Sequence, residues 1–335
     1  MIMVPRPHAH NLVAWAKDRP DVVVLSADLT ASCEADLFRD AYPDRFFSMG
    51  MAEQNMIGVA AGLAREGYTP CVHTFAVFIT RRAFDQVAMA IAYPNLRVRL
   101  FGFLPGITTP GGVTHQAIDD IALMRAIPNM HIIEVGDATE VESALDVADA
   151  IDGPVYLRML RGEVPRLFPP HHPLQANGVR DLGDGDDITL VSSGICTQEA
   201  MAAAKVMRAA GLTVQHLHVS TLKPFPADIL CAALRPHRGP VLSIENHSII
   251  GGLGSALAEV MAEAALARPL VRLGLRDTYA HGASTPYLMA KLGIDTAGIL
   301  AAAGARLGVD FSDANPCCDT DAVPAASFDA KPEAL

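Results

Sequence analysis

The chain has 335 residues, of which 50% are hydrophobic and 19% are charged, and its formal net charge is −11. This composition excludes an intrinsically disordered protein, and a net-negative chain without a Lys/Arg cluster is a poor partner for nucleic acid or an anionic membrane. The first twenty residues hold no signal-peptide core, no transmembrane-length run follows, and the six cysteines lack disulfide spacing. We therefore expect a cytoplasmic protein, long enough for two domains.

The first half of the chain alternates short apolar runs with amphipathic segments, which is typical of βα units. Strands are predicted at 22–28, 70–78, 98–103, 131–135 and 155–160, and helices at 51–66, 82–93 and about 140–150. Alternation at this spacing predicts a parallel sheet that is covered by helices on both faces. We assign residues 1–164 to this first domain.

Residues 165–186 are rich in Pro, Gly and polar residues, which predicts a linker between two domains. A second α/β series is predicted over residues 187–308, with strands at 188–194, 213–220, 240–246 and 270–275. Residues 309–335 show no periodicity and are predicted to form a disordered tail. The predicted fold class is therefore α/β, with two doubly wound domains.

Polar and aromatic residues follow several predicted strands, at the edge where open parallel sheets bind ligands. They are Asp28, Ser32, Glu53, Phe75, Phe78 and His115. Each has an ordinary structural explanation. An early-turn glutamate favours the helix dipole, aromatic residues pack in cores, and a lone histidine often only satisfies hydrogen bonds. Taken singly, none of them indicates a function.

Taken together, these motifs resemble the middle domain of the transketolase and deoxyxylulose-phosphate synthase group. The matching segments are SADLTAS (26–32), GMAEQN (50–55), TFAVF (74–78), RAFDQV (82–87), THQ (114–116) and LRMLRGEVP (157–165). Residues 187–308 resemble the C-terminal domain of the same family, with ENH (245–247) followed by GGLG (251–254). The resemblance covers the chain up to the tail and points to the pyrimidine-binding and C-terminal half of a split transketolase.

The resemblance implies thiamine diphosphate as cofactor and a role for each matching residue. Glu53 matches the glutamate that hydrogen-bonds the pyrimidine ring nitrogen and promotes proton transfer within the cofactor. Phe75 and Phe78 match the residues that hold the flat pyrimidine ring. Asp28 matches a residue close to the cofactor at the dimer contact. Arg81 lies near the cofactor edge, where relatives place Gly or an aromatic residue.

The resemblance also implies which residues contact the substrate. His115 matches a histidine near the reacting carbon, where it transfers a proton or supports an oxyanion. Arg161 matches the arginine that binds the sugar phosphate, and a guanidinium fork suits that anion. Ser32 and Arg6 match further phosphate-contacting positions. Arg158, on the same predicted strand as Arg161, is interpreted as structural.

The motif set contains only half of the cofactor site. In the family, the diphosphate and Mg²⁺ are held by G-D-G and by an Asn about thirty residues later, which supplies hard oxygen ligands. The GDGD at 183–186 has no Asn between Asn177 and Asn246, and we interpret it as a turn. No residue of this chain is assigned to the metal. We expect a diphosphate-binding partner subunit, which holds most of the cofactor and the Mg²⁺, in an α₂β₂ assembly.

Three positions depart from the family pattern. Phe103 replaces a histidine, Gly111 replaces an acidic residue that recognises a sugar hydroxyl, and Arg81 is the third departure. These changes favour a branched or modified ketose phosphate, such as apulose 4-phosphate, as donor of a two-carbon ketol unit. An aldose phosphate such as glyceraldehyde 3-phosphate would accept the unit. Two alternatives stay open, the E1 β subunit of a 2-oxo acid dehydrogenase and a non-catalytic partner homologue.

Overall fold

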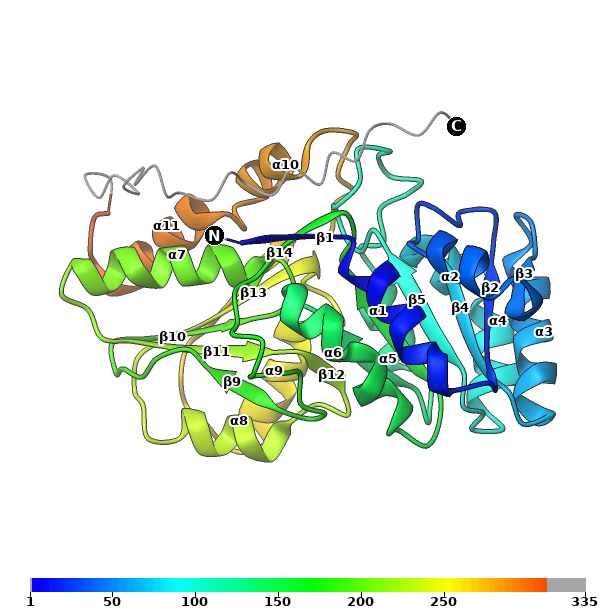
Figure 1. Ribbon diagram of the computed structural model, residues 1–335. Helices are drawn as coiled ribbons and strands as arrows, with labels where there is room; N and C mark the ends of the chain where they lie inside the picture. The colour runs from blue at the N-terminus through cyan, green and yellow to red at the C-terminus, as the bar shows by residue number, and fades with distance from the viewer. Residues whose placement is uncertain (1, 312–335) are drawn as a thin grey trace.

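The computed structural model describes residues 2–311, which form two α/β domains that lie side by side (Figure 1). The first domain is built on a seven-stranded sheet and the second on a five-stranded sheet. The predicted fold class is confirmed. Most of the predicted tail lies outside the described residues, but Phe311 is still buried beside Gly304, so the packed chain continues past the predicted end at 308.

The seven-stranded sheet is parallel except at one edge, where the last strand is antiparallel to its neighbour. In spatial order its strands are β12 (Thr221–Lys223), β6 (His131–Glu134), β7 (Val155–Met159), β5 (Arg99–Phe103), β4 (Thr69–Phe75), β2 (Val22–Ser26) and β3 (Phe46–Ser48). In β2, Val22 and Val24 pack into one core, whereas Val23 and Leu25 pack into another. Burial on both faces explains why the strand is continuously apolar.

Helices cover both faces of this sheet (Figure 1). One face carries α1 (Pro7–Trp15), η1 (Ala16–Asp18), α2 (Asp36–Ala41) and α6 (Ala138–Asp149), and the other carries α3 (Glu53–Arg65), η3 (Phe78–Arg82), α4 (Phe84–Gln86), η4 (Val87–Ala92) and α5 (Asp120–Arg125). A short turn η2 (Pro43–Arg45) precedes β3. The helix predicted at 82–93 begins earlier, because the π-helical turns of η3 start at Phe78. Such turns occur frequently at functional sites.

The second domain orders its strands β14-β13-β10-β11-β9, and only β9 is antiparallel. These strands are β9 (Val179–Asp181), β10 (Ile188–Ser192), β11 (Val214–Val219), β13 (Val241–Ser248) and β14 (Leu270–Leu275). The helices are α7 (Cys196–Ala209), α8 (Ala227–Leu234), α9 (Leu253–Glu263), α10 (Thr285–Leu292) and α11 (Thr296–Leu307). Since α7 and α11 pack on one face and α8 and α9 on the other, this sheet is also a covered one.

One stretch of the described chain, Thr285–Leu307, is long and apolar enough to cross a membrane by length and composition. It differs from the expectation that no such run exists. In the structure this stretch is two helices, because Gly293 adopts a left-handed φ of 68° and ends α10. In the 18-residue window that meets this criterion, 33% of the residues are buried, and α11 packs against α7. Each helix thus buries one face against the second domain, with Leu288 and Met289 in α10 and Ile299 and Ala303 in α11.

One short strand pair joins the two domains, whereas the other short strands pair within a single domain. β12 follows β11 of the second domain in sequence but hydrogen-bonds to β6 of the first sheet. β8 (Glu163–Pro165) pairs with β1 (Met3–Pro5), and the segment predicted as a linker contributes β9 to the second sheet. The GDGD segment leads through a turn into β10, with Asp186 bridged to Val214. The chain thus crosses between the domains more than once.

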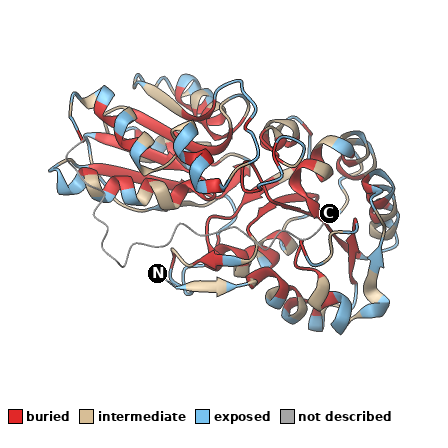
Figure 2. Cartoon of the chain, turned by 90° about the horizontal axis from the view of Figure 1, so that it is seen from above, coloured by how far each residue is buried: buried red, intermediate tan, exposed pale blue. Residues whose placement is uncertain are grey.

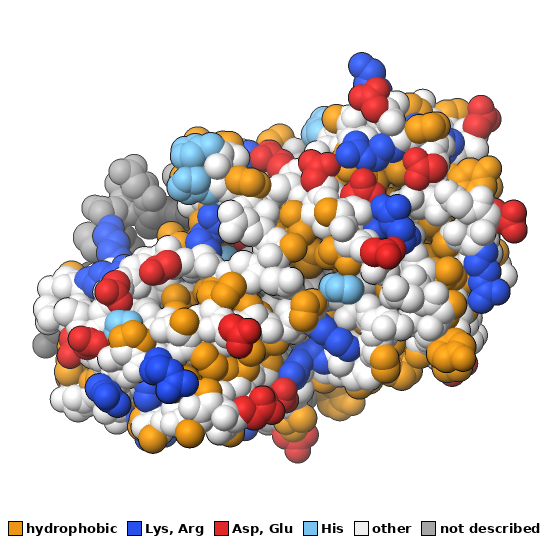
Figure 3. Space-filling view, turned by 90° about the horizontal axis from the view of Figure 1, so that it is seen from below, with side chains coloured by type: hydrophobic (Ala, Val, Ile, Leu, Met, Phe, Trp, Pro, Cys, Tyr) orange, Lys and Arg blue, Asp and Glu red, His pale blue; other side chains and the backbone are white. Residues whose placement is uncertain are grey.

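Burial and charge follow this architecture. Buried residues fill the strands and the inward sides of the helices, whereas exposed residues lie on the outer helix surfaces (Figure 2). On the face shown in Figure 3, basic and acidic side chains are interspersed. An anionic substrate must therefore be held by local groups rather than by a broad positive field.

Candidate active site

The candidate residues gather at the carboxyl edge of the seven-stranded sheet. Parallel strands bring their carboxyl ends to one edge, and ligands bind there in open α/β sheets. The residues that follow these ends are Asp28 and Ser32 after β2, Glu53 after β3, Phe75 and Phe78 at the end of β4, His115 after β5 and Arg161 after β7. Segments far apart in the sequence thus supply one edge.

Glu53 is the first residue of α3 and is buried, with 1% of its surface exposed. Arg82 Nη1 lies 2.9 and 2.8 Å from the two carboxylate oxygens of Glu53. The Arg82 guanidinium also lies over the Phe78 ring, 4.2 Å from its centroid, in a cation–π contact. Glu53 therefore has a cationic partner within this chain, one that the sequence pattern did not single out.

Phe75, Phe78 and His115 form an aromatic cluster next to this ion pair. The rings of Phe75 and Phe78 are stacked, with centroids 5.9 Å apart and an interplanar angle of 24°. His115 meets both rings edge-on, with centroids 6.3 Å from Phe75 and 5.4 Å from Phe78. Because Phe75 is buried and Phe78 and His115 are only half-buried, the cluster offers flat apolar walls with a titratable edge.

Gly111 lies directly against His115. A Cβ atom at position 111 would lie 3.1 Å from the Cβ and Cγ atoms of His115, which is tighter than most packing contacts. His115 lies between Thr114, whose Oγ1 is 2.9 Å from His115 Nδ1, and the aromatic rings. A side chain at 111 would therefore require His115 to shift by a few tenths of an ångström.

The two remaining cofactor candidates, Arg81 and Asp28, differ in their surroundings. Arg81 Nε lies 2.9 and 3.0 Å from the carboxylate oxygens of Asp119, the residue that precedes α5. Asp28 is exposed and adopts a left-handed φ of 61°, and within residues 2–311 its side chain makes no hydrogen bond. Arg81 is thus held inside the first domain, whereas Asp28 faces outward from the loop after β2.

The three predicted phosphate-binding residues come together at one place. Arg161 Nη1 donates a hydrogen bond of 2.5 Å to the Ser32 carbonyl. The backbone N–H of Arg6 donates to the Gly162 carbonyl at 2.7 Å, and the Arg6 guanidinium pairs with Asp36. Two arginines from opposite ends of the first domain therefore flank the loop after β2.

A buried carboxylate, Glu34, lies inside this arginine cluster. Its oxygens accept hydrogen bonds from the backbone N–H of Gly162 at 2.6 Å and of Ala9 at 3.3 Å. Burial raises the pKa of the Glu34 carboxyl, and these two bonds and the charges of Arg6 and Arg161 offset part of that rise. Nothing in the sequence pattern marked Glu34 as part of this site.

Phe103, the other departure, is a core residue. It is fully buried below the edge, in an aromatic cluster with His8 and His73, whose Nε2 atoms lie 2.9 Å apart. His73 Nδ1 lies 3.1 Å from the Cys71 carbonyl and donates to it, so His73 Nε2 accepts the proton of His8 Nε2. Burial lowers the pKa of His73 to about 4 and also lowers that of His8. Phe103 therefore does not widen the exposed wall of the site.

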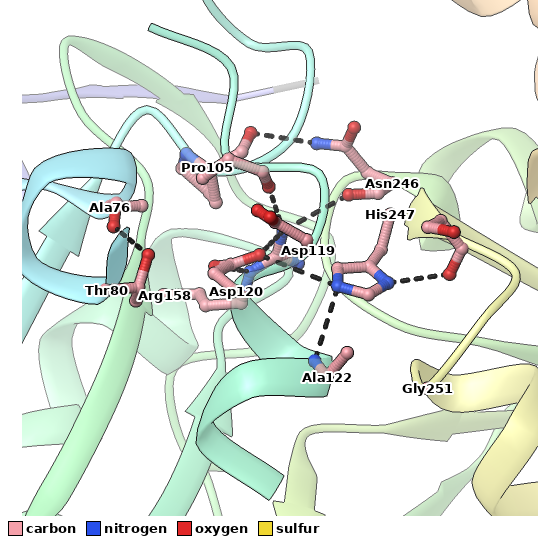
Figure 4. Close-up of polar contacts among 12 residues, drawn as sticks. Ala76, Thr80, Pro105, Asp119, Asp120, Ala122, Arg158, Asn246, His247 and Gly251 are labelled. Atoms are coloured by element: carbon pink, nitrogen blue, oxygen red, sulfur yellow. Dashed lines mark hydrogen bonds and ion pairs between the residues drawn. The ribbon is translucent and has the colours of Figure 1, made fainter. Parts of the chain in front are cut away.

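A buried polar network joins the two domains behind this edge (Figure 4). Arg158 and Asp120 are fully buried, and Arg158 Nε lies 2.8 Å from Asp120 Oδ2. Arg158 also pairs with Glu134 and donates to the Asn246 carbonyl of the second domain at 3.1 Å. The nearby carboxylates raise the pKa of Arg158, and Tyr156 donates to Asp120 at 2.6 Å. These contacts support a structural role for Arg158.

Comparison with known families and proteins identifies the family of this chain. The family model of the transketolase pyrimidine-binding domain matches residues 8–166, and that of the transketolase C-terminal domain matches residues 177–299. The chain is 43% identical over 301 residues to a putative uncharacterized transketolase family protein, y4mN, of Sinorhizobium fredii, covering 89% of this chain and 87% of that protein. This chain belongs to the transketolase family.

Two other family members of similar length are named as transketolase subunits. The 6-deoxy-6-sulfo-D-fructose transketolase subunit SqwH of Clostridium sp. strain MSTE9 is 38% identical over 87% of this chain and 90% of its own length. An apulose-4-phosphate transketolase subunit of Actinobacillus succinogenes is 33% identical over 82% of this chain and 87% of its own. The chain is therefore of the split transketolase type, with the pyrimidine-binding and C-terminal domains.

A solved transketolase structure shares the whole architecture. It is described as a split-gene transketolase in an inactive β4 tetramer, and it superposes with a TM-score of 0.80 at 38% identity. The match covers 90% of this chain and 97% of that one. The arrangement of the two domains is therefore that of a split transketolase subunit.

The residues present fit one part of the family cofactor. A buried carboxylate beside stacked phenylalanines suits a flat heteroaromatic ring that presents a nitrogen, such as the pyrimidine of thiamine diphosphate. Among residues 2–311, no group of three or more His, Cys, Asp or Glu side chains is placed to hold a metal ion. The described part of this transketolase chain thus suits the pyrimidine ring of the cofactor.

Proposed function

We propose that this chain is the pyrimidine-binding subunit of a transketolase that moves a two-carbon ketol unit from a ketose phosphate to an aldose phosphate. The observation that carries the proposal is buried Glu53 beside the rings of Phe75, Phe78 and His115, at the carboxyl edge of the sheet. When bound, thiamine diphosphate supplies the carbanion-stabilising chemistry that amino-acid side chains lack. The chain's residues supply position, proton transfer and anion binding.

In this proposal the residues of the aromatic cluster divide the work. Glu53 holds or exchanges a proton with the pyrimidine ring nitrogen, and Phe75 and Phe78 clamp that ring. His115, at the edge of the rings, reaches the substrate near the reacting carbon and moves a proton or stabilises a developing oxyanion. Asp28 lies close to the cofactor at the contact with the partner subunit, and Arg81 lies near the edge of the cofactor.

Arg161, Arg6 and Ser32 bind the substrate phosphate in this proposal. Their clustering supports it, because Arg161 contacts the loop that bears Ser32, and the Arg6 backbone contacts the residue after Arg161. A phosphate would recruit the two guanidinium groups by charge-assisted hydrogen bonds. The positive charge that binds the phosphate thus comes from two neighbouring guanidinium groups, which suits a chain of net charge −11.

We further propose that a diphosphate-binding partner covers the exposed side of α3, holds the Mg²⁺ and forms an α₂β₂ enzyme. Exposed apolar side chains lie close to this helix in the chain or in space: Met51 precedes α3, and Met89 and Tyr93 lie in and directly after the adjacent η4. A Cβ atom added at Gly58 or Gly62 of α3 would contact nothing, so a neighbouring chain could approach this helix closely. The free thiols Cys71, Cys196 and Cys231 support a reducing, cytoplasmic location.

The proposed donor is a modified ketose phosphate such as apulose 4-phosphate, which is named for one relative; another relative is named for a modified ketose that carries a sulfonate, 6-deoxy-6-sulfo-D-fructose. Gly111 supports this choice, because a position that holds an acidic hydroxyl-binding residue in the family pattern here has no side chain. Glyceraldehyde 3-phosphate is the proposed acceptor. A standard pentulose phosphate would then be the poorer donor.

The experiment combines this chain with the diphosphate-binding subunit encoded beside it, with thiamine diphosphate and Mg²⁺. Cleavage of xylulose 5-phosphate, apulose 4-phosphate and sulfofructose is followed with both chains and with each alone, by release of the product that remains when the ketol unit is removed. Turnover that needs both chains supports the proposal. Decarboxylation of a 2-oxo acid would assign the chain to the E1 β alternative, which the relatives do not favour, and inactivity in both assays would favour the non-catalytic homologue.

A further inference from the structure

The loop that bears His115 is closed at its base by a short neck. The neck is formed where Pro105 and Ala117 make an isolated parallel bridge and the N–H of Gly106 donates to the Ala117 carbonyl at 2.9 Å. His115 lies only two residues before this bridge. The position of the neck therefore sets the position of His115 at the aromatic cluster.

The side-chain amide of Asn246, in β13 of the second domain, contacts this neck with both of its ends, and Figure 4 shows the contact with Pro105. Its Nδ2 donates to the Pro105 carbonyl at 3.0 Å, and its Oδ1 accepts the backbone N–H of Ile107 at 2.9 Å. Asn246 is buried, with 1% of its surface exposed. The amide thus satisfies one buried donor and one buried acceptor on either side of Gly106.

Gly106 is shaped to receive this amide. Its φ is 61°, and a Cβ atom on it would lie 2.1 to 2.4 Å from the side-chain atoms of Asn246. A side chain at 106 would therefore occupy the space of the Asn246 amide, and the left-handed backbone favours glycine in any case. The two residues fit each other across the domain boundary.

Other contacts hold the far parts of the same loop against the second domain. Gln116 Nε2 donates to the His281 carbonyl at 3.1 Å, and a Cβ on Gly112 would meet the backbone of Gly282 at 3.2 Å. Beyond the neck, the N–H of Ser248 donates to the Ile118 carbonyl at 2.8 Å. The contacts of Asn246 differ from these because one side chain bonds to the backbone on both sides of Gly106.

We propose that Asn246 is a positioning residue for the reaction: from the second domain, it fixes the neck of the loop that places His115. The inference rests on the proposed function for its effect on turnover. It assigns the second domain a part in organising the site, although Asn246 contacts neither the aromatic cluster nor the arginine cluster. Removing the amide would leave the Ile107 N–H buried without a partner, and the loop would shift to rehydrate it. The Pro105 carbonyl would lose its bond to Asn246 but would still accept from Thr108 Oγ1 at 2.7 Å.

The test compares Asn246→Ala and Asn246→Asp with a matched control, Asn11→Ala. Asn11 Nδ2 also donates to a backbone carbonyl, that of Glu142 at 2.7 Å, but between α1 and α6 and away from the loop. Both Asn246 variants are expected to lower kcat by about 10- to 100-fold, since small misplacements of catalytic groups have effects of this size. Asp keeps the shape but cannot donate to Pro105, so its failure to rescue would show that the hydrogen bond matters. Asn11→Ala should keep its kcat.

A double-mutant cycle with His115→Ala separates positioning from a general loss of structure. If Asn246 acts through His115, Asn246→Ala should lower kcat less than about twofold in the His115→Ala background. Equal losses in both backgrounds would overturn the inference. So would an Asn246→Ala enzyme with unchanged kcat.

Amide hydrogen exchange provides a readout that needs no turnover. In the assembled enzyme, Asn246→Ala should speed exchange in residues 104–118 and leave the helices of the first domain protected. Unchanged exchange in this loop would overturn the inference even if activity fell. Full activity of His115→Ala would instead defeat the proposed role of His115, and faster loop exchange would then still support the Asn246 grip on the neck.

Discussion

Arg82 Nη1 lies within 2.9 Å of both carboxylate oxygens of Glu53, so a half-exposed cation covers the buried carboxylate proposed to act on the cofactor. The same guanidinium lies over the ring of Phe78. Under the proposed function, a pyrimidine ring at Glu53 competes with Arg82 for the carboxylate. We therefore expect cofactor binding to weaken the ion pair between Arg82 and Glu53.

Glu53→Gln tests the proton role of the carboxyl group. The amide has nearly the same shape but cannot exchange a proton, so kcat of the assembled enzyme should fall about 100-fold or more. Turnover of ketose phosphate and the mass of the complex are measured together, and assembly should persist. Glu66→Gln, an exposed change just past the other end of α3, is the control. Normal turnover of Glu53→Gln would contradict the proposed role.

Arg82→Gln tests whether Arg82 competes with the cofactor for Glu53. Without the guanidinium, the Kd of thiamine diphosphate in the assembled enzyme should fall by about three- to tenfold, or about 1 kcal/mol. Isothermal titration with the cofactor gives this value. Arg81→Gln is a close control, because the neighbouring arginine pairs with Asp119 instead. Weaker binding in Arg82→Gln would mean that Arg82 holds Glu53 ready for the cofactor.

Glu34→Gln tests the carboxylate inside the arginine cluster. Neutralising it should strengthen the attraction of Arg161 and Arg6 for a phosphate, and KM for the phosphorylated ketose should fall about two- to fivefold. The amide oxygen can still accept from the Gly162 N–H, so the loop should keep its shape. KM for a ketose without phosphate serves as the control and should not change. A higher KM for the phosphorylated substrate would show that Glu34 instead holds the arginines in place.

The buried pair His8 and His73 predicts acid sensitivity. The pKa of His73 is about 4 in the folded protein, below its ordinary value near 6.5, so protonation favours the unfolded chain. The contribution of His73 to the free energy of unfolding should be fully present above pH about 6.5, decrease as the pH falls, and be smaller by about 3 kcal/mol at pH about 4.

Urea unfolding over this pH range measures the effect. His73→Gln should flatten the pH dependence, whereas His10→Gln, on the exposed side of α1, should not. An unchanged slope in His73→Gln would assign the acid sensitivity to other groups, such as His216 and His247, whose pKa values burial also lowers.

Arg158→Met tests the interdomain network. The substitution leaves the carboxylates of Asp120 and Glu134 buried without their cation, which should destabilise the protein by about 3–5 kcal/mol. Denaturant unfolding gives the loss. Arg97→Met, which breaks an exposed pair with Asp149, should lose less than about 1 kcal/mol. Comparable losses in the two variants would argue against a structural role for Arg158.

The central strands of both sheets could be predicted because they are buried on both faces and largely apolar, as in Val22–Ser26. The short strands β1 and β3 are only partly buried and were missed. Helix α1 was missed, since it begins after Arg6, which adopts a left-handed φ of 46°, and no capping side chain marks its start. The three-residue β12 was also missed, because its only strand partner is β6, about ninety residues earlier in the chain. A strand that is stabilised by pairing with a distant segment has no local sequence pattern from which it could be predicted.

The residues of the candidate site also divide into those that could be predicted from the sequence and those that could not. Glu53, Phe75, Phe78 and His115 could be found from motif order, and the structure brings them together. Arg82 and Glu34 could not be found, since their role depends on which side chain faces them after folding. The motif ENH was noticed only as a resemblance, and the contact of Asn246 with Pro105 needs both domains in place.

The strand β12 bears on how this protein can be divided. A fragment that ended near residue 186 would contain all the motifs of the first domain but would lack Thr221–Lys223. Its seven-stranded sheet would lose its terminal strand and expose the β6 edge, whose unpaired backbone groups can recruit a strand from another molecule. The isolated first domain should therefore tend to aggregate or to swap strands, although its sequence has every appearance of an autonomous unit.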